Sequence, residues 1–320
     1  METLNLRLVY EAKRRIRRWI WRTPLRYSRG LSRLIGGEVW LKLENQQVTG
    51  SFKPRGVANK LLRLKAEGGA KGLVTSSSGN HALALGYLSQ RLGLNSVVVV
   101  PRGTPQVKLR AIRDLGVKLR IHGSEYMEAE TEAKRIAVEE GRIFISPYND
   151  VDVIAGHGTI ALELLEDQPR VEVVLVPVGG GGLISGIATA IKGLSSDVEV
   201  VGVQPSASPV MYESVKRGHV VELEIGESIA EALLGGIEAD SITLDLCRRY
   251  VDDFIVVDED YVREGVRWML LEERQVAEGG GAIGVAALLA EPDRFRGKRI
   301  AVVVSGGNID RRLLRELLLR

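Results

Sequence analysis

One stretch of the sequence indicates the fold more clearly than any other: Val176-Pro177-Val178-Gly179-Gly180-Gly181-Gly182-Leu183-Ile184-Ser185-Gly186. The apolar run 173–176 that leads into it is typical of a strand buried on both faces, and residues 182–193 have helical periodicity. Four glycines at such a junction leave backbone N–H groups free to converge on an anion, and the helix N-terminus adds partial positive charge. We therefore predict a phosphate-binding loop, with a flexible strand-to-helix connection as the alternative.

The rest of the chain repeats this alternation of short apolar runs and helical patterns, which is typical of parallel sheets covered by helices. Strands are predicted at 39–43, 73–76, 96–101, 118–121, 172–177, 198–203, 253–257 and 299–304. Helices are predicted at 80–93, 105–115, 124–140, 182–193 and 259–273, and a further amphipathic helix at Val9, Ala12, Ile16, Trp19 and Ile20. Ligands of such folds bind beyond the carboxyl ends of the strands, so the glycine-rich loops are the expected site.

Length and charge limit the classes of protein that fit. A chain of 320 residues predicts one large or two interleaved domains with a substantial core. The net charge of +3 provides no field that would draw the protein to nucleic acid or to an anionic membrane. The basic cluster 13–18 permits a nucleic-acid patch or a transit peptide, but a solvated helix face is the simpler interpretation. We therefore expect neither nucleic acid nor membrane as a partner.

Cysteine usage and hydropathy bear on location and metal binding. The single cysteine, Cys247, cannot form an intramolecular disulfide, and no Cys/His spacing suits zinc. The sequence has no apolar run of about 18 residues and no hydrophobic N-terminal segment of the signal-peptide kind. We expect a cytoplasmic protein without a metal site.

A second motif, Thr49-Gly50-Ser51-Phe52-Lys53-Pro54-Arg55-Gly56, places a lysine between an aromatic residue and a proline that is suited to open a helix. A partly desolvated lysine near a positive helix end has its neutral amine favoured, which is the form that makes Schiff bases. Considered alone, the motif is more simply explained by a solvated surface lysine at position 53.

Three further segments combine polar residues with glycines at a strand end or helix start: Thr75-Ser76-Ser77-Ser78-Gly79-Asn80-His81-Ala82, Val276-Ala277-Glu278-Gly279-Gly280-Gly281-Ala282 and Val302-Val303-Val304-Ser305-Gly306-Gly307-Asn308-Ile309-Asp310. Free N–H groups and small donors at a helix N-terminus suit a substrate carboxylate. Each segment by itself is better explained as an ordinary helix cap or turn.

Together and in this order, the five segments resemble those of the fold-type II enzymes that use pyridoxal 5′-phosphate (PLP), especially threonine/serine dehydratases and serine racemases. The resemblance extends from Thr23-Pro24-Leu25 to the C-terminus, and 152–161 resembles the helix that follows the small domain in this family. It implies an α/β fold of two domains, each an open, mostly parallel sheet covered by helices. A large PLP-binding domain is expected at 1–67 and 147–320, and a small substrate-closing domain at 68–146. A homodimer is also implied.

The resemblance assigns roles to residues of the five segments. Lys53 corresponds to the lysine that forms the Schiff base and acts in catalysis, and Ser78 to the base that racemases use on the opposite face. The other expected cofactor-binding residues are Phe52, beside the ring, Asn80, at the phenolic oxygen, Gly179, Gly180, Gly181 and Gly182, at the phosphate, Glu278, and Ser305, at the pyridine nitrogen. The expected substrate-binding residues are Ser77, Ser78, Gly79 and His81.

The implied reaction removes water from L-threonine or L-serine and gives a 2-oxo acid and ammonia, with PLP as the electron sink. Gln204 and Ser208 stand where some relatives have metal ligands, and Ala129 where animal racemases have an arginine, which favours a dehydratase without metal. A serine racemase, a β-replacing synthase and a catalytically silent amino-acid-binding protein remain alternatives. Residues 228–237 resemble those of dehydratases for hydroxyectoine utilisation, so a specialised 3-hydroxy-amino-acid dehydratase is a further alternative.

Overall fold

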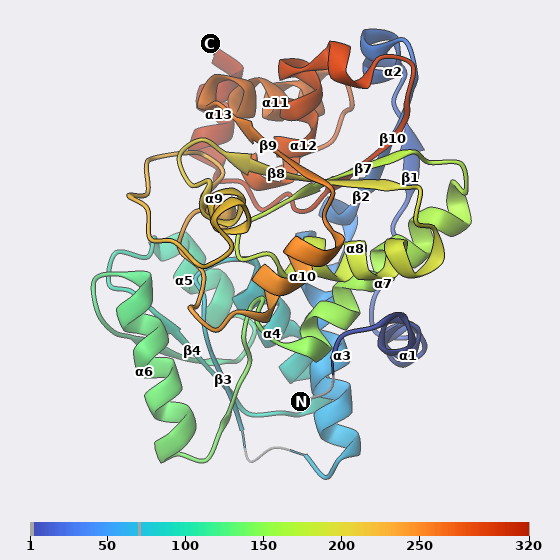
Figure 1. Ribbon diagram of the computed structural model, residues 1–320. Coiled ribbons are helices and arrows are strands. Elements are labelled where there is room, and N and C mark those ends of the chain that lie inside the picture. The colour runs from blue at the N-terminus through green and yellow to red at the C-terminus, as the bar shows by residue number, and fades with distance from the viewer. Residues whose placement is uncertain (1–2, 70–71, 320) are drawn as a thin grey trace.

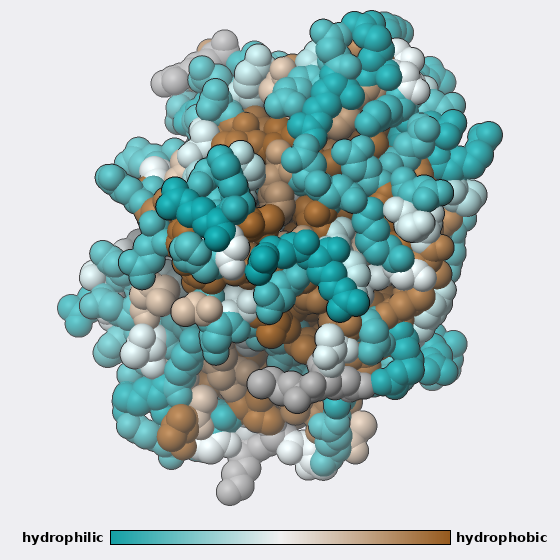
Figure 2. Space-filling model, viewed as in Figure 1, coloured by the Kyte–Doolittle hydropathy of each residue, from teal (hydrophilic) through white to brown (hydrophobic). Residues whose placement is uncertain are grey.

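The computed structural model describes residues 3–69 and 72–319, and within them the strands form two sheets. The larger sheet has the order β1-β2-β10-β7-β8-β9 and the smaller one β5-β4-β3-β6. Figure 1 shows the two sheets side by side, with helices on both faces of each. The predicted α/β class is confirmed. Polar side chains cover most of the face seen in Figure 2.

The larger sheet is parallel except at one edge, where β1 runs antiparallel to β2. Its strands are β1 (Leu25–Tyr27), β2 (Glu38–Leu43), β10 (Arg299–Val304), β7 (Val173–Pro177), β8 (Glu199–Pro205) and β9 (Asp253–Val257). One face is covered by α2 (Arg29–Ile35), α11 (Glu259–Leu271), α12 (Gly279–Ala290) and α13 (Arg311–Leu319), and the other by α1 (Leu6–Ile16), α7 (Val151–Asp167), α8 (Gly182–Leu194) and α10 (Ile242–Tyr250).

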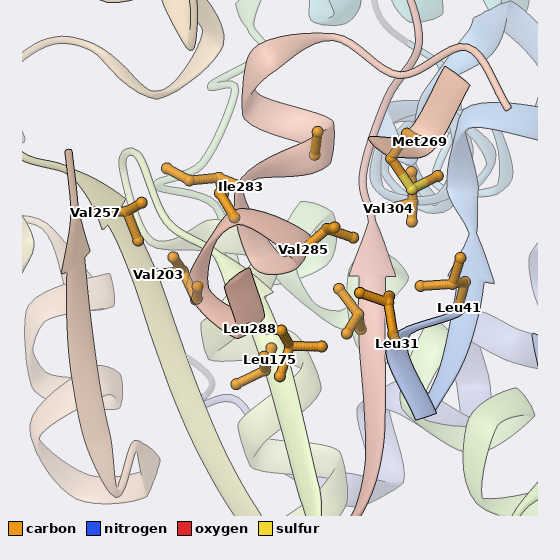
Figure 3. Close-up of a cluster of buried hydrophobic side chains, with 14 of the residues drawn as sticks. Leu31, Leu41, Leu175, Val203, Val257, Met269, Ile283, Val285, Leu288 and Val304 are labelled. Carbon is orange, nitrogen blue, oxygen red and sulfur yellow. The ribbon is translucent and has the colours of Figure 1, made fainter. Parts of the chain in front are cut away.

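Alternate residues of each central strand enter two separate cores. Leu175 of β7 packs with Val203 and with Leu288 of α12 (Figure 3), whereas Val174 and Val176 face α7 and α8. Burial on both faces explains why these strands are continuous apolar runs in the sequence.

The smaller sheet is wholly parallel and contains β5 (Lys118–Ile121), β4 (Ser96–Val100), β3 (Leu73–Ser76) and β6 (Ile143–Phe144). On one side it packs against α3 (Lys53–Ala66), α4 (Asn80–Leu92) and α5 (Gln106–Arg113), and on the other against α6 (Tyr126–Glu139). The remaining elements are α9 (Val210–Arg217) and the 3-10 turns η1 (Glu44–Gln46), η2 (Val48–Gly50), η3 (Glu231–Leu233) and η4 (Pro292–Phe295).

All eight predicted strands are present, within two residues at each end. Strands β1 and β6 were not predicted, because strands of three and two residues are too short to display a period. The N-terminal helix ends at Ile16, so Trp19 and Ile20 lie beyond it, although Ile20 is still buried. None of the helices in the described ranges has the length and apolar character needed to cross a bilayer.

Glycines let α3, α7 and α8 pack closely in the centre of the molecule. A Cβ at Gly156 of α7 would overlap the carbonyl of Arg55, and one at Gly186 of α8 would overlap the carbonyl of Ile154. This close packing anchors the helix that begins at Lys53 to the core of the larger sheet.

Candidate active site

Tertiary contacts bring four of the five segments together. The N–H of Phe52 donates to the carbonyl of Ser305 at 3.0 Å, and the N–H of Glu278 donates to the carbonyl of Gly306 at 3.1 Å. The Asn80 side chain reaches Glu278 at 2.6 Å. The glycine loop joins this group through residues 147–148, because Tyr148 packs on Gly180 and the Lys53 amine donates to Pro147.

Lys53 is the first residue of α3 and Pro54 the second, as the sequence predicted. Its Nζ donates to the carbonyl of Pro147 at 2.8 Å and lies 5.0 Å from the centre of the Phe52 ring. Burial lowers the pKa of Lys53 to about 8, against the opposing attraction of Glu278. A larger fraction of this amine is therefore neutral and nucleophilic near pH 8 than in a solvated lysine. The Phe52 ring is held from the side by His157, with ring centroids 4.7 Å apart.

The loop at the carboxyl end of β7 has the geometry of an anion cradle. In the described part of the chain, the backbone N–H groups of Gly179, Gly180, Gly181 and Gly182 have no acceptor. Gly181 has a φ of 83°, which disfavours any residue with a side chain. A Cβ at Gly180 would lie 2.5 Å from the Tyr148 ring, so the glycines are also required by packing.

A second set of free donors lies at the N-terminus of α4. Within the described residues, the N–H groups of Ser78, Asn80 and His81 have no acceptor, and Ser77 Oγ accepts from Gly79. A Cβ at Gly79 would meet nothing within 4 Å, so the space beside this helix end is open. These features suit a carboxylate.

The His81 ring itself turns away from this open space. It is 2% exposed, and its Nε2 is 3.1 Å from the carbonyl of Ile145. Burial, followed by the positive charge of Lys53, lowers the pKa of His81 to about 3, so the ring is neutral. The backbone of His81, rather than its imidazole, is the part available to a substrate.

Ser305 and Glu278 lie on two neighbouring loops next to the segment that contains Lys53. Ser305 is buried at the end of β10, and its hydroxyl donates to the carbonyl of Gly280 at 3.2 Å. Burial raises the pKa of Glu278 to about 7, and the hydrogen bond from Asn80 opposes that rise. The Glu278 carboxyl therefore titrates close to neutral pH.

Several buried polar atoms around the site have no partner among the described residues, including Ser51 Oγ, Ser76 Oγ and His81 Nδ1. Buried polar groups are normally satisfied, and these atoms lie in the segments that carry Lys53 and Asn80, so the protein leaves polar capacity unused beside the site. A cradle of N–H groups, a lysine amine, an amide and a hydroxyl are the groups that a phosphorylated pyridine aldehyde requires. The residues present therefore fit PLP.

A buried charge cluster next to the site was not anticipated. Arg55 is fully buried and bonds both oxygens of Glu44 and both oxygens of Glu163, while Lys42 donates to Glu163 at 2.6 Å. Burial opposes ionisation of Glu163, but Arg55 and Lys42 outweigh it and lower the pKa of that carboxyl. The sequence did contain one signal of this buried charge cluster, because Lys42 and Glu163 each interrupt an apolar run.

Two positions used to argue for a dehydratase have structural roles. Gln204 is buried and donates to the Ser208 carbonyl at 3.2 Å. Ala129 is buried in the core between α6 and the smaller sheet, in the cluster that contains Val74 and Val97. In residues 3–69 and 72–319, no group of three His, Cys, Asp or Glu side chains is placed to hold a metal ion.

Comparison with known proteins defines the class. The model of the family described as pyridoxal-phosphate dependent enzyme matches residues 16–306, and the chain belongs to this family. The L-threonine ammonia-lyase of Thermotoga maritima is 43% identical over 307 residues, which are 96% of this chain and 76% of that protein. The structure of maize serine racemase superposes with a TM-score of 0.92 at 31% identity, covering 99% of this chain and 98% of that one. For the T.th. threonine deaminase the TM-score is 0.88 at 38% identity, with 96% and 99% covered. The fold is therefore that of the fold-type II PLP enzymes.

Proposed function

We propose that the chain is a PLP-dependent L-threonine/L-serine dehydratase, an ammonia-lyase that releases a 2-oxo acid and ammonia. One observation carries the proposal: the Lys53 amine, with a pKa of about 8, belongs to the same group of contacts as the free N–H groups of Gly179–Gly182 and the start of α4. The relatives named above as threonine ammonia-lyase and threonine deaminase support the choice of substrate.

The site residues have the following proposed roles. Ser77, Ser78, Gly79 and His81 form the binding site for the substrate carboxylate, with the free N–H groups of Ser78 and His81 as donors. The neutral Lys53 amine removes the α-proton. Bound PLP would supply the electron sink for Cα, and the Cβ hydroxyl would then leave with a proton as water. Phe52, Asn80, Glu278, Ser305 and the glycines 179–182 hold the cofactor.

Lys53 serves as a base because its environment favours the neutral amine at working pH. The buried, neutral His81 and His157 near it keep positive charge out of the site. With the cofactor bound, the Ser305 hydroxyl would turn its hydrogen from the Gly280 carbonyl to the pyridine nitrogen. A neutral hydroxyl does not hold that nitrogen protonated.

The domain division at 67/68 and 146/147 is part of this proposal. Residues 68–146 contain the smaller sheet, and we assign to them closure over the substrate with exclusion of water. A homodimer in the cytoplasm is the proposed state of the enzyme.

Serine racemase is the second candidate. The half-buried Ser78 side chain, which has no hydrogen bond within the described residues, occupies the position of the racemase base, and maize serine racemase has a closely similar fold. A specialised 3-hydroxy-amino-acid dehydratase is the third.

The test compares wild type with Lys53→Ala, using visible spectra with added PLP and release of keto acid from L- and D-threonine and L- and D-serine. Keto acid from L-threonine with wild type alone supports the proposal. D-serine as the main product from L-serine supports the racemase. Cofactor absorbance without turnover of any of these amino acids points to the specialised dehydratase. A wild type that binds no PLP contradicts all three.

A further inference from the structure

The Asn80 side chain is held from two sides. Its Nδ2 donates to Glu278 Oε1 at 2.6 Å, and its Oδ1 accepts from Asn308 Nδ2, also at 2.6 Å. Asn308 Nδ2 also donates to the carbonyl of Thr49 at 2.8 Å. Four residues from four separate segments thus form one chain of hydrogen bonds beside Lys53.

The direction of this chain follows from the group at its end. The Thr49 carbonyl is only an acceptor, so the nitrogen of the Asn308 amide must face it. The same nitrogen contacts Asn80, so the oxygen of the Asn80 amide lies on that side and its nitrogen faces Glu278. One hydrogen of Asn80 Nδ2 is used by Glu278, and the second is free for a ligand.

The backbone that contacts Asn308 has an energetically unfavourable conformation. Thr49 has a φ of 65°, in the left-handed region that a β-branched residue disfavours. Gly50 follows with a φ of 74°, and a Cβ there would lie only 2.7 Å from Asn308 Oδ1. Strained backbone persists where the surroundings hold it, and here it presents the Thr49 carbonyl to Asn308.

We propose that Asn308 is a positioning residue: it fixes the orientation of the Asn80 amide, so that an N–H rather than a carbonyl oxygen faces the cofactor. This inference rests on the proposed contact of Asn80 with the phenolic oxygen of PLP. Asn308 acts through Asn80 and does not itself touch the cofactor.

A double-mutant cycle on PLP affinity tests this inference without using activity. The proteins are wild type, Asn80→Ala, Asn308→Asp and the double variant, and the dissociation constant for PLP is measured by quenching of tryptophan fluorescence. Aspartate is similar in size but cannot donate, so it turns the Asn80 amide over. Asn308→Asp is expected to weaken PLP binding by about tenfold in the wild-type background and by less than about twofold in the Asn80→Ala background.

Two variants separate positioning from folding. Asn308→Ala removes the hydrogen bonds without reversing the amide, so it is expected to weaken PLP binding by about threefold, less than Asn308→Asp. Asn45→Asp is the matched control, because Asn45 donates to the nearby Val276 carbonyl at 3.0 Å without contacting Asn80. Its affinity for PLP should stay within about twofold of wild type.

The outcomes are distinguishable. Equal losses from Asn308→Asp in both backgrounds, or a loss in Asn308→Ala as large as in Asn308→Asp, overturn the positioning role of Asn308 alone. Unchanged PLP affinity in Asn80→Ala overturns the proposed role of Asn80 in cofactor binding, and the inference about Asn308 with it.

Discussion

The guanidinium of Arg55 and the carboxylate of Glu163 form a bidentate ion pair, with nitrogen–oxygen distances of 2.7 and 2.8 Å. The side-chain exposure is 0% for Arg55 and 7% for Glu163. Arg55 stands two residues after Lys53, so this pair ties the first turn of α3 to α7. Buried pairs of this kind add little net stability but are costly to break from one side.

Arg55→Lys is therefore expected to lower the free energy of unfolding by about 3–5 kcal/mol, because lysine cannot satisfy Glu44 and Glu163 at once. Urea denaturation of the ligand-free protein measures the loss. Arg135→Lys on α6 is the control, since the Arg135 side chain is 49% exposed and pairs with Glu132 and Glu139 of its own helix, so its replacement should cost far less. Losses of similar size in the two variants would contradict the structural role of the buried pair.

The raised pKa of Glu278 predicts that the stability of the protein depends on pH. Its pKa is about 7 in the folded protein, raised by burial from the ordinary 4.5. Between pH 4.5 and 7 the folded state therefore holds a proton on Glu278 that the unfolded state has lost, so this proton stabilises the folded state. The stabilising contribution is complete below pH 4.5 and disappears as the pH rises through 7.

The ligand-free wild type should consequently lose at most about 3 kcal/mol relative to Glu278→Gln between pH 4.5 and 7.5. Chemical denaturation of both proteins across this range measures the difference. Parallel stability curves for the two proteins would show that the Glu278 carboxyl titrates normally.

Two glycine substitutions should separate folding from ligand binding. Gly180→Ala places a Cβ against the Tyr148 ring and is expected to destabilise the protein by about 1–3 kcal/mol. Gly79→Ala meets no neighbour within 4 Å, so stability should be retained. Its methyl group enters the open space at the start of α4, so the KM for L-threonine should rise about tenfold. Thermal unfolding and steady-state kinetics give the two readouts, and an unchanged KM in Gly79→Ala would remove this space from the substrate site.

Two ion pairs connect α5 and α6 to residues 228–241. Lys108 pairs with Glu231 at 2.6 Å, and Lys134 with Glu238 at 2.8 Å. If they hold residues 68–146 closed on the substrate, the double variant Lys108→Ala/Lys134→Ala should raise KM about threefold while kcat changes less. Added salt should also raise the KM of the wild type, because salt screens these ion pairs. Arg135→Ala, with partners only on its own helix, is the control; an equal rise in its KM would argue against closure by these pairs.

Local pattern was sufficient for much of the fold and for the chemical groups of the site. The strand before Gly179, the helix after Gly182 and the helix start at Lys53 each depend on neighbours within a few residues, and the structure places all three where the sequence predicted them. Strand β6 was missed because a partner strand, rather than its own two residues, defines it.

Local sequence patterns were therefore enough to predict the α/β elements, a glycine loop, a lysine at one helix start and an asparagine at another. Long-range contacts had to be seen in three dimensions to learn that Asn308, 228 residues away, holds Asn80, that Arg55 is buried between two carboxylates, and that the His81 ring turns toward Ile145. The physical reason is that these contacts join separate segments in space. Neither residue of such a pair has a local periodicity or propensity from which its partner could be predicted.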